Sequence, residues 1–158
     1  MKPTVYLMLG LPGSGKTTFS KSLQKELSIP RLSLDEEYSR LGGDLASTKW
    51  DVDIESGANQ LIRSQIKELV SRGDSVILDF CPWKKDKRRD YKEFIHSIGA
   101  NSHLYYFDVT IDELMRRLKE RSTISSSETH IVTSDMLNAF NARFDTPHNE
   151  DYELVEVK

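Results

Sequence analysis

The sequence is poor in several features by which large classes of protein are recognised. Cys81 is the only cysteine among the 158 residues, so an internal disulfide is excluded and a reducing, cytoplasmic environment is favoured. No apolar run approaches the roughly 18 residues that a membrane-spanning helix needs. The apolar run Thr4–Leu9 is also too short for the core of a signal peptide. We therefore expect a cytoplasmic protein that makes no contact with membranes.

Basic charge is not in excess either. The net charge is −3, and the four histidines show no spacing that is typical of metal ligands. A broad nucleic-acid-binding surface is not expected, because such surfaces neutralise phosphates with many lysines and arginines. Any contact with nucleic acid would be local, for example at a strand end, and a small molecule is at least as good a candidate partner.

The sequence does contain an alternation of short apolar segments with longer amphipathic ones. The short segments predict five strands, over Thr4–Leu9, Arg31–Leu34, Ser75–Phe80, His103–Val109 and Tyr152–Val157. The segments between them have helical periodicity, as in the helix predicted over about 53–72, which Gly73 would end. A chain of this length suits one domain, here 1–158. The alternation predicts an α/β three-layer sandwich, in which helices cover both faces of a central parallel sheet of about five strands.

Residues 10–17 match the phosphate-binding motif G-x-x-x-x-G-K-[ST] in full, between a predicted strand and a predicted helix. Glycines let the backbone turn its N–H groups inward, and the start of the helix adds positive potential. We expect Lys16 to reach the outer phosphates of ATP and the Thr17 hydroxyl to bind Mg²⁺. The motif therefore predicts a P-loop NTPase whose nucleotide-binding residues include Gly10, Pro12, Gly13, Ser14, Gly15, Lys16, Thr17 and Thr18.

Two aspartates follow predicted strands. Asp79 comes after the apolar run Val76–Leu78, where it could hold Mg²⁺ directly or through water. Asp35 follows Arg31–Leu34, and if both strands flank the first one, the two carboxylates converge on the terminal phosphate. Asp35 could then act as a catalytic base toward an acceptor hydroxyl. Capping of a following helix is an alternative role for either aspartate.

Arginines are concentrated on the helix predicted after the fourth strand. Arg117 and Arg121 are four residues apart and share one helix face. Because a polar segment follows them, we expect an arginine-bearing lid over about 116–132 that closes over ATP, excludes water and brings guanidinium groups to the phosphates. The alternative is a solvated face with ion pairs to Glu113 and Glu120.

Two further groups of side chains each allow two interpretations. A basic cluster could bind phosphates of an acceptor or form a solvated helix face, and its members are Lys84, Lys85, Lys87, Arg88 and Arg89. Three aromatic side chains could stack on an acceptor or pack within the protein, and these are Tyr38, Trp50 and Trp83.

Together these residues resemble the small P-loop kinases typified by the 5′-kinase domain of phage polynucleotide kinase, with chloramphenicol phosphotransferases and zeta toxins as more distant relatives. The resemblance covers nearly the whole chain. It implies Mg²⁺-dependent transfer of the γ-phosphate of ATP to a hydroxyl. By this resemblance Asp35 is the general base, Arg121 is a lid residue on the ATP phosphates, and Arg117 lies near the nucleotide. Tyr38 stands where polynucleotide kinases have a substrate-binding arginine, so the acceptor stays open between a small molecule and a nucleic-acid 5′-hydroxyl.

Two other functions are alternatives to a kinase. One is a nucleotide-hydrolysing switch, and the other is an ATP-binding module without an acceptor. The guanine-reading motif of a switch GTPase is matched in letters by residues 48–51, but these precede the strand before Asp79, which is the wrong place in such a fold. A pure binding module has no need of a base at the position of Asp35.

Overall fold

Five parallel strands form the centre of the structure, a computed structural model that describes residues 1–47, 49–122 and 132–156. The strand order is β2-β3-β1-β4-β5, and every neighbouring pair is parallel. The strands are β1 (Thr4–Leu9), β2 (Arg31–Leu32), β3 (Val76–Leu78), β4 (Asn101–Tyr106) and β5 (Glu153–Leu154). The predicted α/β architecture with a five-stranded parallel sheet is confirmed.

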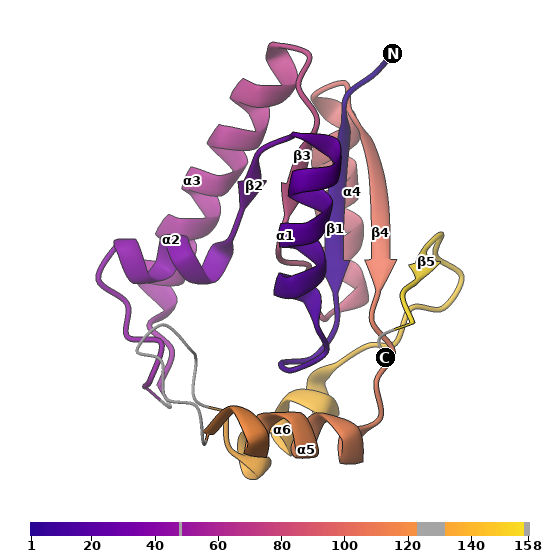
Figure 1. Ribbon diagram of the computed structural model, residues 1–158. Coiled ribbons are helices and arrows are strands. Elements are labelled where there is room, and N and C mark those ends of the chain that lie inside the picture. The colour runs from indigo at the N-terminus through magenta and orange to yellow at the C-terminus, as the bar shows by residue number, and fades with distance from the viewer. Residues whose placement is uncertain (48, 123–131, 157–158) are drawn as a thin grey trace.

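Helices connect the strands and cover both faces of the sheet (Figure 1). Those in the described part of the chain are α1 (Lys16–Leu27), α2 (Leu34–Arg40), α3 (Val52–Ser71), α4 (Lys85–Ser97), α5 (Ile111–Ser122) and α6 (Ser134–Arg143). The α1 helix lies on one face, and α3 and α4 lie on the other. Helices α5 and α6 lie beyond the carboxyl ends of β1 and β4, which is the edge where ligands bind in open parallel sheets.

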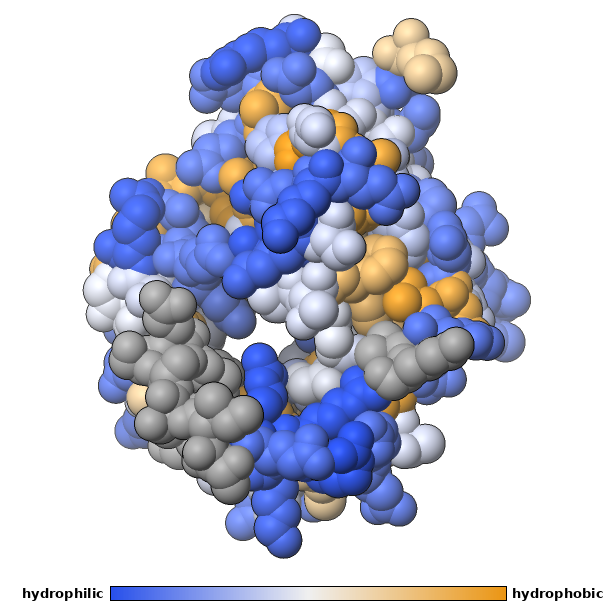
Figure 2. All heavy atoms as spheres, viewed as in Figure 1, coloured by the Kyte–Doolittle hydropathy of each residue, from blue (hydrophilic) through white to orange (hydrophobic). Residues whose placement is uncertain are grey.

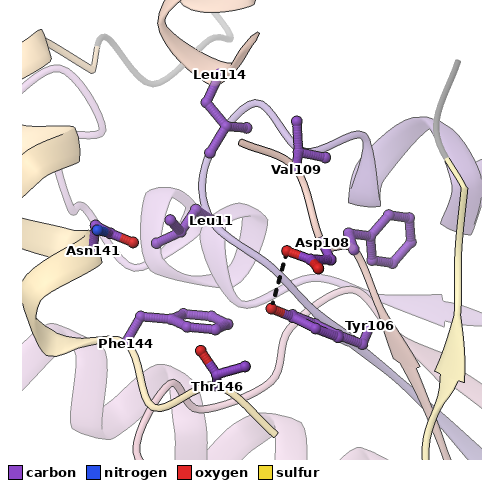
Figure 3. Close-up of a pocket in the computed structure, with 9 residues that line it drawn as sticks. Leu11, Tyr106, Asp108, Val109, Leu114, Asn141, Phe144 and Thr146 are labelled. Carbon is purple, nitrogen blue, oxygen red and sulfur yellow. Dashed lines mark hydrogen bonds between the residues drawn. The ribbon is translucent and has the colours of Figure 1, made fainter. Parts of the chain in front are cut away.

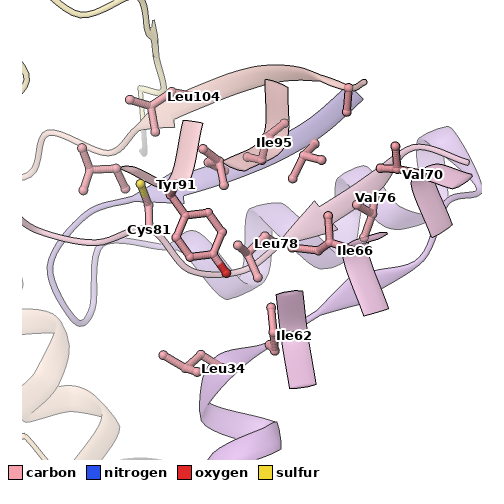
Figure 4. Packing of buried hydrophobic residues seen from close by; sticks show 14 of the residues in the cluster. Leu34, Ile62, Ile66, Val70, Val76, Leu78, Cys81, Tyr91, Ile95 and Leu104 are labelled. Atoms are coloured by element: carbon pink, nitrogen blue, oxygen red, sulfur yellow. The ribbon is translucent and has the colours of Figure 1, made fainter. Parts of the chain in front are cut away.

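The core follows from the alternation of side chains along the strands. In β1, Val5 and Leu7 face the core that α3 and α4 cover, whereas Met8 faces the core beneath α1. Figure 4 shows the first of these cores, where the helices contribute Ile62, Ile66, Val70, Tyr91 and Ile95 against strand residues Val76, Leu78 and Leu104. Because β1 is buried on both faces, the loop that follows it starts from a rigid base.

The boundary of β2 differs from the prediction in a way that matters for the site. The predicted strand Arg31–Leu34 is too long, because Ser33 caps α2 by accepting a hydrogen bond from the Glu36 amide at 3.3 Å. Asp35 therefore lies in the first turn of a short helix. In addition, β3 separates β2 from β1, so the arrangement in which both aspartate-bearing strands flank the first strand is wrong.

The other predicted elements are present with shifted limits. The fourth strand starts two residues earlier than predicted and ends at Tyr106, and β5 has only two residues. The helix predicted over about 53–72 is α3. Part of the expected lid, residues 123–131, and Thr48 and Val157 lie outside the described residues. None of the helices described is both long and apolar enough to span a bilayer.

Candidate functional site

The loop between β1 and α1 has the backbone of an anion-binding turn. Gly13 and Gly15 have φ angles of 85° and 98°, in the left-handed region that favours glycine. Gly15 caps α1 and has no side chain with which to occupy the amides of the first helical turn. Those amides point toward the loop, where a negatively charged group can accept hydrogen bonds from them.

The start of this loop is packed tightly against the end of β4. A Cβ atom on Gly10 would lie 2.6 Å from Ser14 Oγ and 3.0 Å from Phe107 Cβ. Ser14 is only 1% exposed, and its Oγ has no hydrogen-bond partner among the described residues. A buried hydroxyl of this kind is suited to a polar ligand of the loop, since leaving it unpaired is costly.

Lys16 lies in the phosphate loop and is influenced by several charged groups of the site. Its Nζ donates to the carbonyl oxygens of Gly10 and Leu11, so the ammonium lies against the loop. Burial lowers the pKa of Lys16, the carboxylates of Asp79 and Asp35 oppose this effect, and Arg121 lowers the pKa further. Electrostatic effects of this kind require proximity, so the structure brings these predicted site residues into one region.

Asp79 lies directly after β3 and is 9% exposed. Its Oδ2 accepts a hydrogen bond of 2.5 Å from the Arg31 guanidinium, while its Oδ1 is buried and unpartnered among the described residues. The following helix α4 has Lys84 at its N-cap, so Asp79 does not cap it. A buried carboxylate oxygen near the loop fits a Mg²⁺ ion or one of its waters, and Thr17 in the first turn of α1 supplies a hydroxyl. The described residues contain no cluster of three or more histidine, cysteine or acidic side chains that would bind a metal alone.

Asp35 is exposed on α2 and does not cap this helix, because Ser33 does so. Its charge acts on Lys16 and also on Glu55 near the start of α3. Burial raises the pKa of Glu55, a hydrogen bond from Trp50 lowers it, and the nearby Asp35 raises it again. The charge of Asp35 on α2 thus influences both the phosphate loop and the start of α3. Figure 2 shows the surface hollowed on this face, between the α2–α3 side and the α5–α6 pair.

Helix α5 lies against the other side of the loop. Arg117 donates to the Gly13 carbonyl at 3.3 Å and to Glu113 at 2.8 Å, and Leu118 packs 3.4 Å from the position of a Cβ on Gly13. Arg121 is exposed at the end of the helix and influences Lys16. Arg116 forms surface ion pairs with Glu113 and Glu120, the alternative considered above for this helix face. Hydrogen bonds from Arg116 and Arg117 hold the pKa of Glu113 down to about 2.

Within the basic cluster at the start of α4, Arg88 and Lys85 have structural roles, whereas Lys87 and Arg89 are exposed. Arg88 is fully buried and donates to Glu150 at 2.8 and 3.0 Å and to the Asp145 carbonyl at 2.9 Å. Lys85 donates to the His148 carbonyl at 2.9 Å. Both interpretations of this cluster are therefore wrong for Arg88, which ties the C-terminal segment to α4.

The three aromatic candidates pack within the protein. Tyr38 is buried and stacks on Trp50 with ring centroids 3.8 Å apart, and its hydroxyl accepts a hydrogen bond from the Asp51 amide at 2.8 Å. Trp83 packs against Phe140 with centroids 5.0 Å apart. These contacts account for the side chains through packing.

A small cavity lies on the α6 side of the loop (Figure 3). It has a volume of about 110 Å³, and its lining residues are Leu11, Tyr106, Phe107, Asp108, Val109, Leu114, Asn141, Phe144 and Thr146. This volume is well below the roughly 300–1,000 Å³ of pockets for small-molecule ligands. The cavity separates the loop from α6 and is too small to hold a nucleotide.

One residue of the site was not predicted from the sequence. Arg31 of β2 lies beside Asp79, and its side chain is 7% exposed. The sequence carries a weak signal, namely a charged residue at the start of a predicted strand, but its partner Asp79 is 48 residues away. Strand register, rather than local pattern, brings them together.

A parallel sheet with this strand order and a phosphate loop after its central strand define the chain as a P-loop nucleotide-binding protein. The AAA domain family (AAA_33) matches residues 5–147, and the chain belongs to this family. The expected resemblance to small P-loop kinases is confirmed.

Known proteins agree with this assignment. An L-seryl-tRNA(Sec) kinase from Methanococcus maripaludis is 28% identical over 145 residues, which cover 89% of this chain and 52% of that protein. A chain of the Pnkp1/Rnl/Hen1 RNA repair complex has a TM-score of 0.69 at 20% identity, covering 90% of this chain and 46% of that chain. The APS kinase of Mycobacterium tuberculosis, in complex with AMPPNP and APS, has a TM-score of 0.70 at 15% identity, with 99% and 91% covered. The chain thus spans about half the length of the first two proteins.

Proposed function

We propose that this chain is an ATP- and Mg²⁺-dependent phosphotransferase that moves the γ-phosphate of ATP to a hydroxyl acceptor. The observation that carries the proposal is the phosphate loop, in which the Lys16 ammonium lies against the carbonyl oxygens of Gly10 and Leu11 and is influenced by the charges of Asp79, Asp35 and Arg121. A phosphoryl-transfer site needs a cation on the outer phosphates, a carboxylate for the metal, a second carboxylate for the acceptor, and a further positive charge that stabilises the transferred group. Here Lys16 is in α1, Asp79 directly follows β3, Asp35 is in α2 and Arg121 is in α5.

The binding roles follow from the contacts of each group. The amides of the loop and Lys16 would hold the phosphates, after the ammonium leaves the carbonyl oxygens of Gly10 and Leu11. Thr17 and Asp79 would hold Mg²⁺, which neutralises charge on the phosphate oxygens when bound. Arg117 donates to the Gly13 carbonyl of the loop, which supports a position near the bound nucleotide.

The transfer step assigns a separate role to Asp35. Its carboxylate accepts the proton of the acceptor hydroxyl as that oxygen attacks the terminal phosphorus. A new oxygen–phosphorus bond forms, the bond from this phosphorus to the bridging oxygen breaks, and ADP leaves. Arg121 stabilises the negative charge that is redistributed during the step. Asp35 suits this role because it is exposed to the acceptor and lies within electrostatic reach of Lys16.

The acceptor belongs to one of two classes, a small molecule with a hydroxyl or the 5′-hydroxyl of a nucleic acid. The L-seryl-tRNA(Sec) kinase relative is consistent with an acceptor attached to nucleic acid. The net charge of −3 favours recognition of a small group over a long phosphate backbone. We place the activity in the cytoplasm, in line with the single cysteine.

The test compares Asp35→Asn with the parent in transfer from labelled ATP·Mg²⁺ to a panel of acceptors. The panel holds 5′-hydroxyl oligonucleotides, nucleosides, aminoglycosides and chloramphenicol. We expect Asp35→Asn to retain nucleotide binding and to lose about 10²- to 10⁴-fold in transfer rate. Asp44→Asn is a matched control, because Asp44 is an exposed aspartate on the loop after α2. Its transfer rate should equal that of the parent.

Three results would contradict the proposal. Equal transfer by Asp35→Asn and the parent would remove Asp35 from the role of base. Failure of the parent to phosphorylate any acceptor, together with hydrolysis that depends on a protein partner, would instead identify a nucleotide-dependent switch. Nucleotide binding with neither transfer nor hydrolysis would identify a binding module.

A further inference from the structure

Arg31 donates hydrogen bonds to three side chains near the phosphate loop. Its Nε donates to Ser20 Oγ at 2.9 Å, one terminal nitrogen donates to Glu36 Oε1 at 2.9 Å, and the other donates to Asp79 Oδ2 at 2.5 Å. All three acceptors lie on different elements, namely α1, α2 and the end of β3. One guanidinium therefore links three of the segments that contribute to the site.

Each of these elements supplies one group of the proposed reaction. Ser20 itself donates to the Thr17 carbonyl at 3.0 Å, so the first contact leads to the residue with the Mg²⁺-binding hydroxyl. Glu36 is next in sequence to Asp35. Asp79 is the carboxylate proposed for the metal. The positions of these groups relative to one another depend on a side chain that touches no reacting atom.

The two oxygens of Asp79 have different surroundings. Arg31 holds Oδ2, and Oδ1 is buried without a partner among the described residues. Because a carboxylate is planar, fixing one oxygen restricts where the other can lie. We propose that Arg31 is a positioning residue, which holds Asp79 so that Oδ1 faces the Mg²⁺ of bound nucleotide.

The chemistry of arginine suits this role better than that of lysine. Its guanidinium is planar, stays charged, and presents several donors in a fixed fork. The same positive charge compensates Asp79 in a buried place, where an unpaired carboxylate would be costly. Without Arg31, the Asp79 carboxylate would be attracted to Lys16, whose pKa it already raises. An ion pair between Lys16 and Asp79 would then compete with binding of phosphate by Lys16 and of metal by Asp79.

The inference rests on the proposed function, because it presupposes that the loop binds nucleotide with Mg²⁺. The test therefore measures binding alone. The non-hydrolysable analogue AMPPNP is titrated calorimetrically into the parent, Arg31→Met, Asp79→Asn and the double variant, each in EDTA and in saturating Mg²⁺. The dissociation constant in EDTA divided by the dissociation constant in Mg²⁺ measures how much Mg²⁺ strengthens nucleotide binding.

We expect Arg31→Met to reduce this ratio by about 10- to 100-fold, the size of effect known for residues that orient metal ligands. In the Asp79→Asn background, the same change should have no further effect on the ratio. An unchanged ratio in Arg31→Met would overturn the inference. An equal loss with and without the Asp79 carboxylate would do the same, because it would indicate a general structural role.

Two more variants keep the test decisive. Arg40→Met is the matched control, because Arg40 is exposed on α2 and contacts Glu37, and it should leave the ratio unchanged. Arg31→Lys retains the charge and cannot bond all three partners at once. If melting curves show that Arg31→Met is unfolded, the same titrations are made with Arg31→Lys instead. A ratio equal to that of the parent in Arg31→Lys would then refute the inference. If the parent itself binds no AMPPNP, the proposed function fails instead.

Discussion

At the scale of single residues, the phosphate loop leaves no room for additional atoms at its first glycine. A methyl group on Gly10 would meet Ser14 Oγ and Phe107 Cβ at distances shorter than van der Waals contact. We predict that Gly10→Ala costs about 1–3 kcal/mol of stability and weakens AMPPNP binding, because the loop must move away from β4. Urea unfolding and calorimetric titration would measure the two effects.

Gly57 provides the matched control for this prediction. It lies inside α3, and a Cβ there would meet Leu41 Cδ1 at 3.7 Å, an ordinary contact. Gly57→Ala should therefore stabilise the protein by about 0.5–1 kcal/mol, since alanine favours a helix interior over glycine. Parental stability and affinity in Gly10→Ala would show that the loop is more adaptable than its packing indicates.

The residues that could be predicted from the sequence are those whose role depends on local chain geometry. The loop glycines and Lys16 follow from an eight-residue motif, and Asp79 follows from its place after a buried strand. Arg31 could not be found in this way, because its contact is with Asp79, which follows another strand. Arg88 was misjudged for a related reason, since Glu150 is 62 residues away.

At the scale of elements, α4 and the C-terminal segment are joined by the buried pair of Arg88 and Glu150. The Glu150 side chain is 8% exposed and also lies 3.7 Å from the Lys92 ammonium. Removing Arg88 would leave this carboxylate buried and without its main partner. We predict that Arg88→Met loses about 3–5 kcal/mol of stability in urea unfolding at neutral pH.

Two further measurements test the cause. Glu150→Met combined with Arg88→Met should recover part of the lost stability, because no buried carboxylate is left without its arginine partner. The carbonyl groups that Arg88 bonds would stay without this donor, so recovery should be incomplete. A double variant that is less stable than Arg88→Met would contradict the argument.

The same pair predicts a dependence on pH. Burial raises the pKa of Glu150, but the Arg88 hydrogen bond and the charges of Arg88 and Lys92 outweigh it and lower the pKa below the ordinary 4.5. A lowered folded-state pKa contributes stability that is present above 4.5 and is lost as the pH falls through the lowered value. The stability difference between the parent and Glu150→Gln should therefore decrease over that acidic range.

Element boundaries show why a sequence pattern locates strands more easily than it orders them. The apolar residues of Arg31–Leu34 predict a strand, but Leu34 is the first residue of α2 and packs in the same core as Ile62. The apolar character of Leu34 predicts that it is buried. Because Ser33 caps α2, Leu34 is buried as part of a helix rather than of a strand. The order of β2 and β3 depends on crossover connections, which the local pattern does not encode.

At the scale of the whole molecule, the site is assembled from segments on opposite sides of the phosphate loop. The α2 side carries Asp35, and the α5 side carries Arg117 and Arg121. Both sides are exposed at the hollowed face in Figure 2, whereas the loop between them rests on the buried β1. A nucleotide bound at the loop would contact groups from both sides and so stabilise the fold as a whole.

This coupling gives a prediction for thermal unfolding. A ligand present at 100 times its dissociation constant stabilises the folded state by about 2.7 kcal/mol. For a chain of this size, that corresponds to an increase in Tm of about 5–11 °C. We expect AMPPNP with Mg²⁺ to produce such a shift, measured by calorimetry, and a smaller shift in EDTA, where the proposed ligands Asp79 and Thr17 would have no metal to bind.

Two lysines of α1 distinguish specific binding from attraction of a polyanion to positive charge. Lys16→Met should abolish most of the shift, because Lys16 is the ammonium that lies within the loop. Lys21→Met should retain the shift. This substitution removes the same charge, but Lys21 is exposed on the same helix and lies outside the loop. Equal shifts in both variants would mean that the nucleotide binds outside the loop. Since exposed charges are screened by salt, a shift that persists at high ionic strength in the parent would further support binding inside the loop.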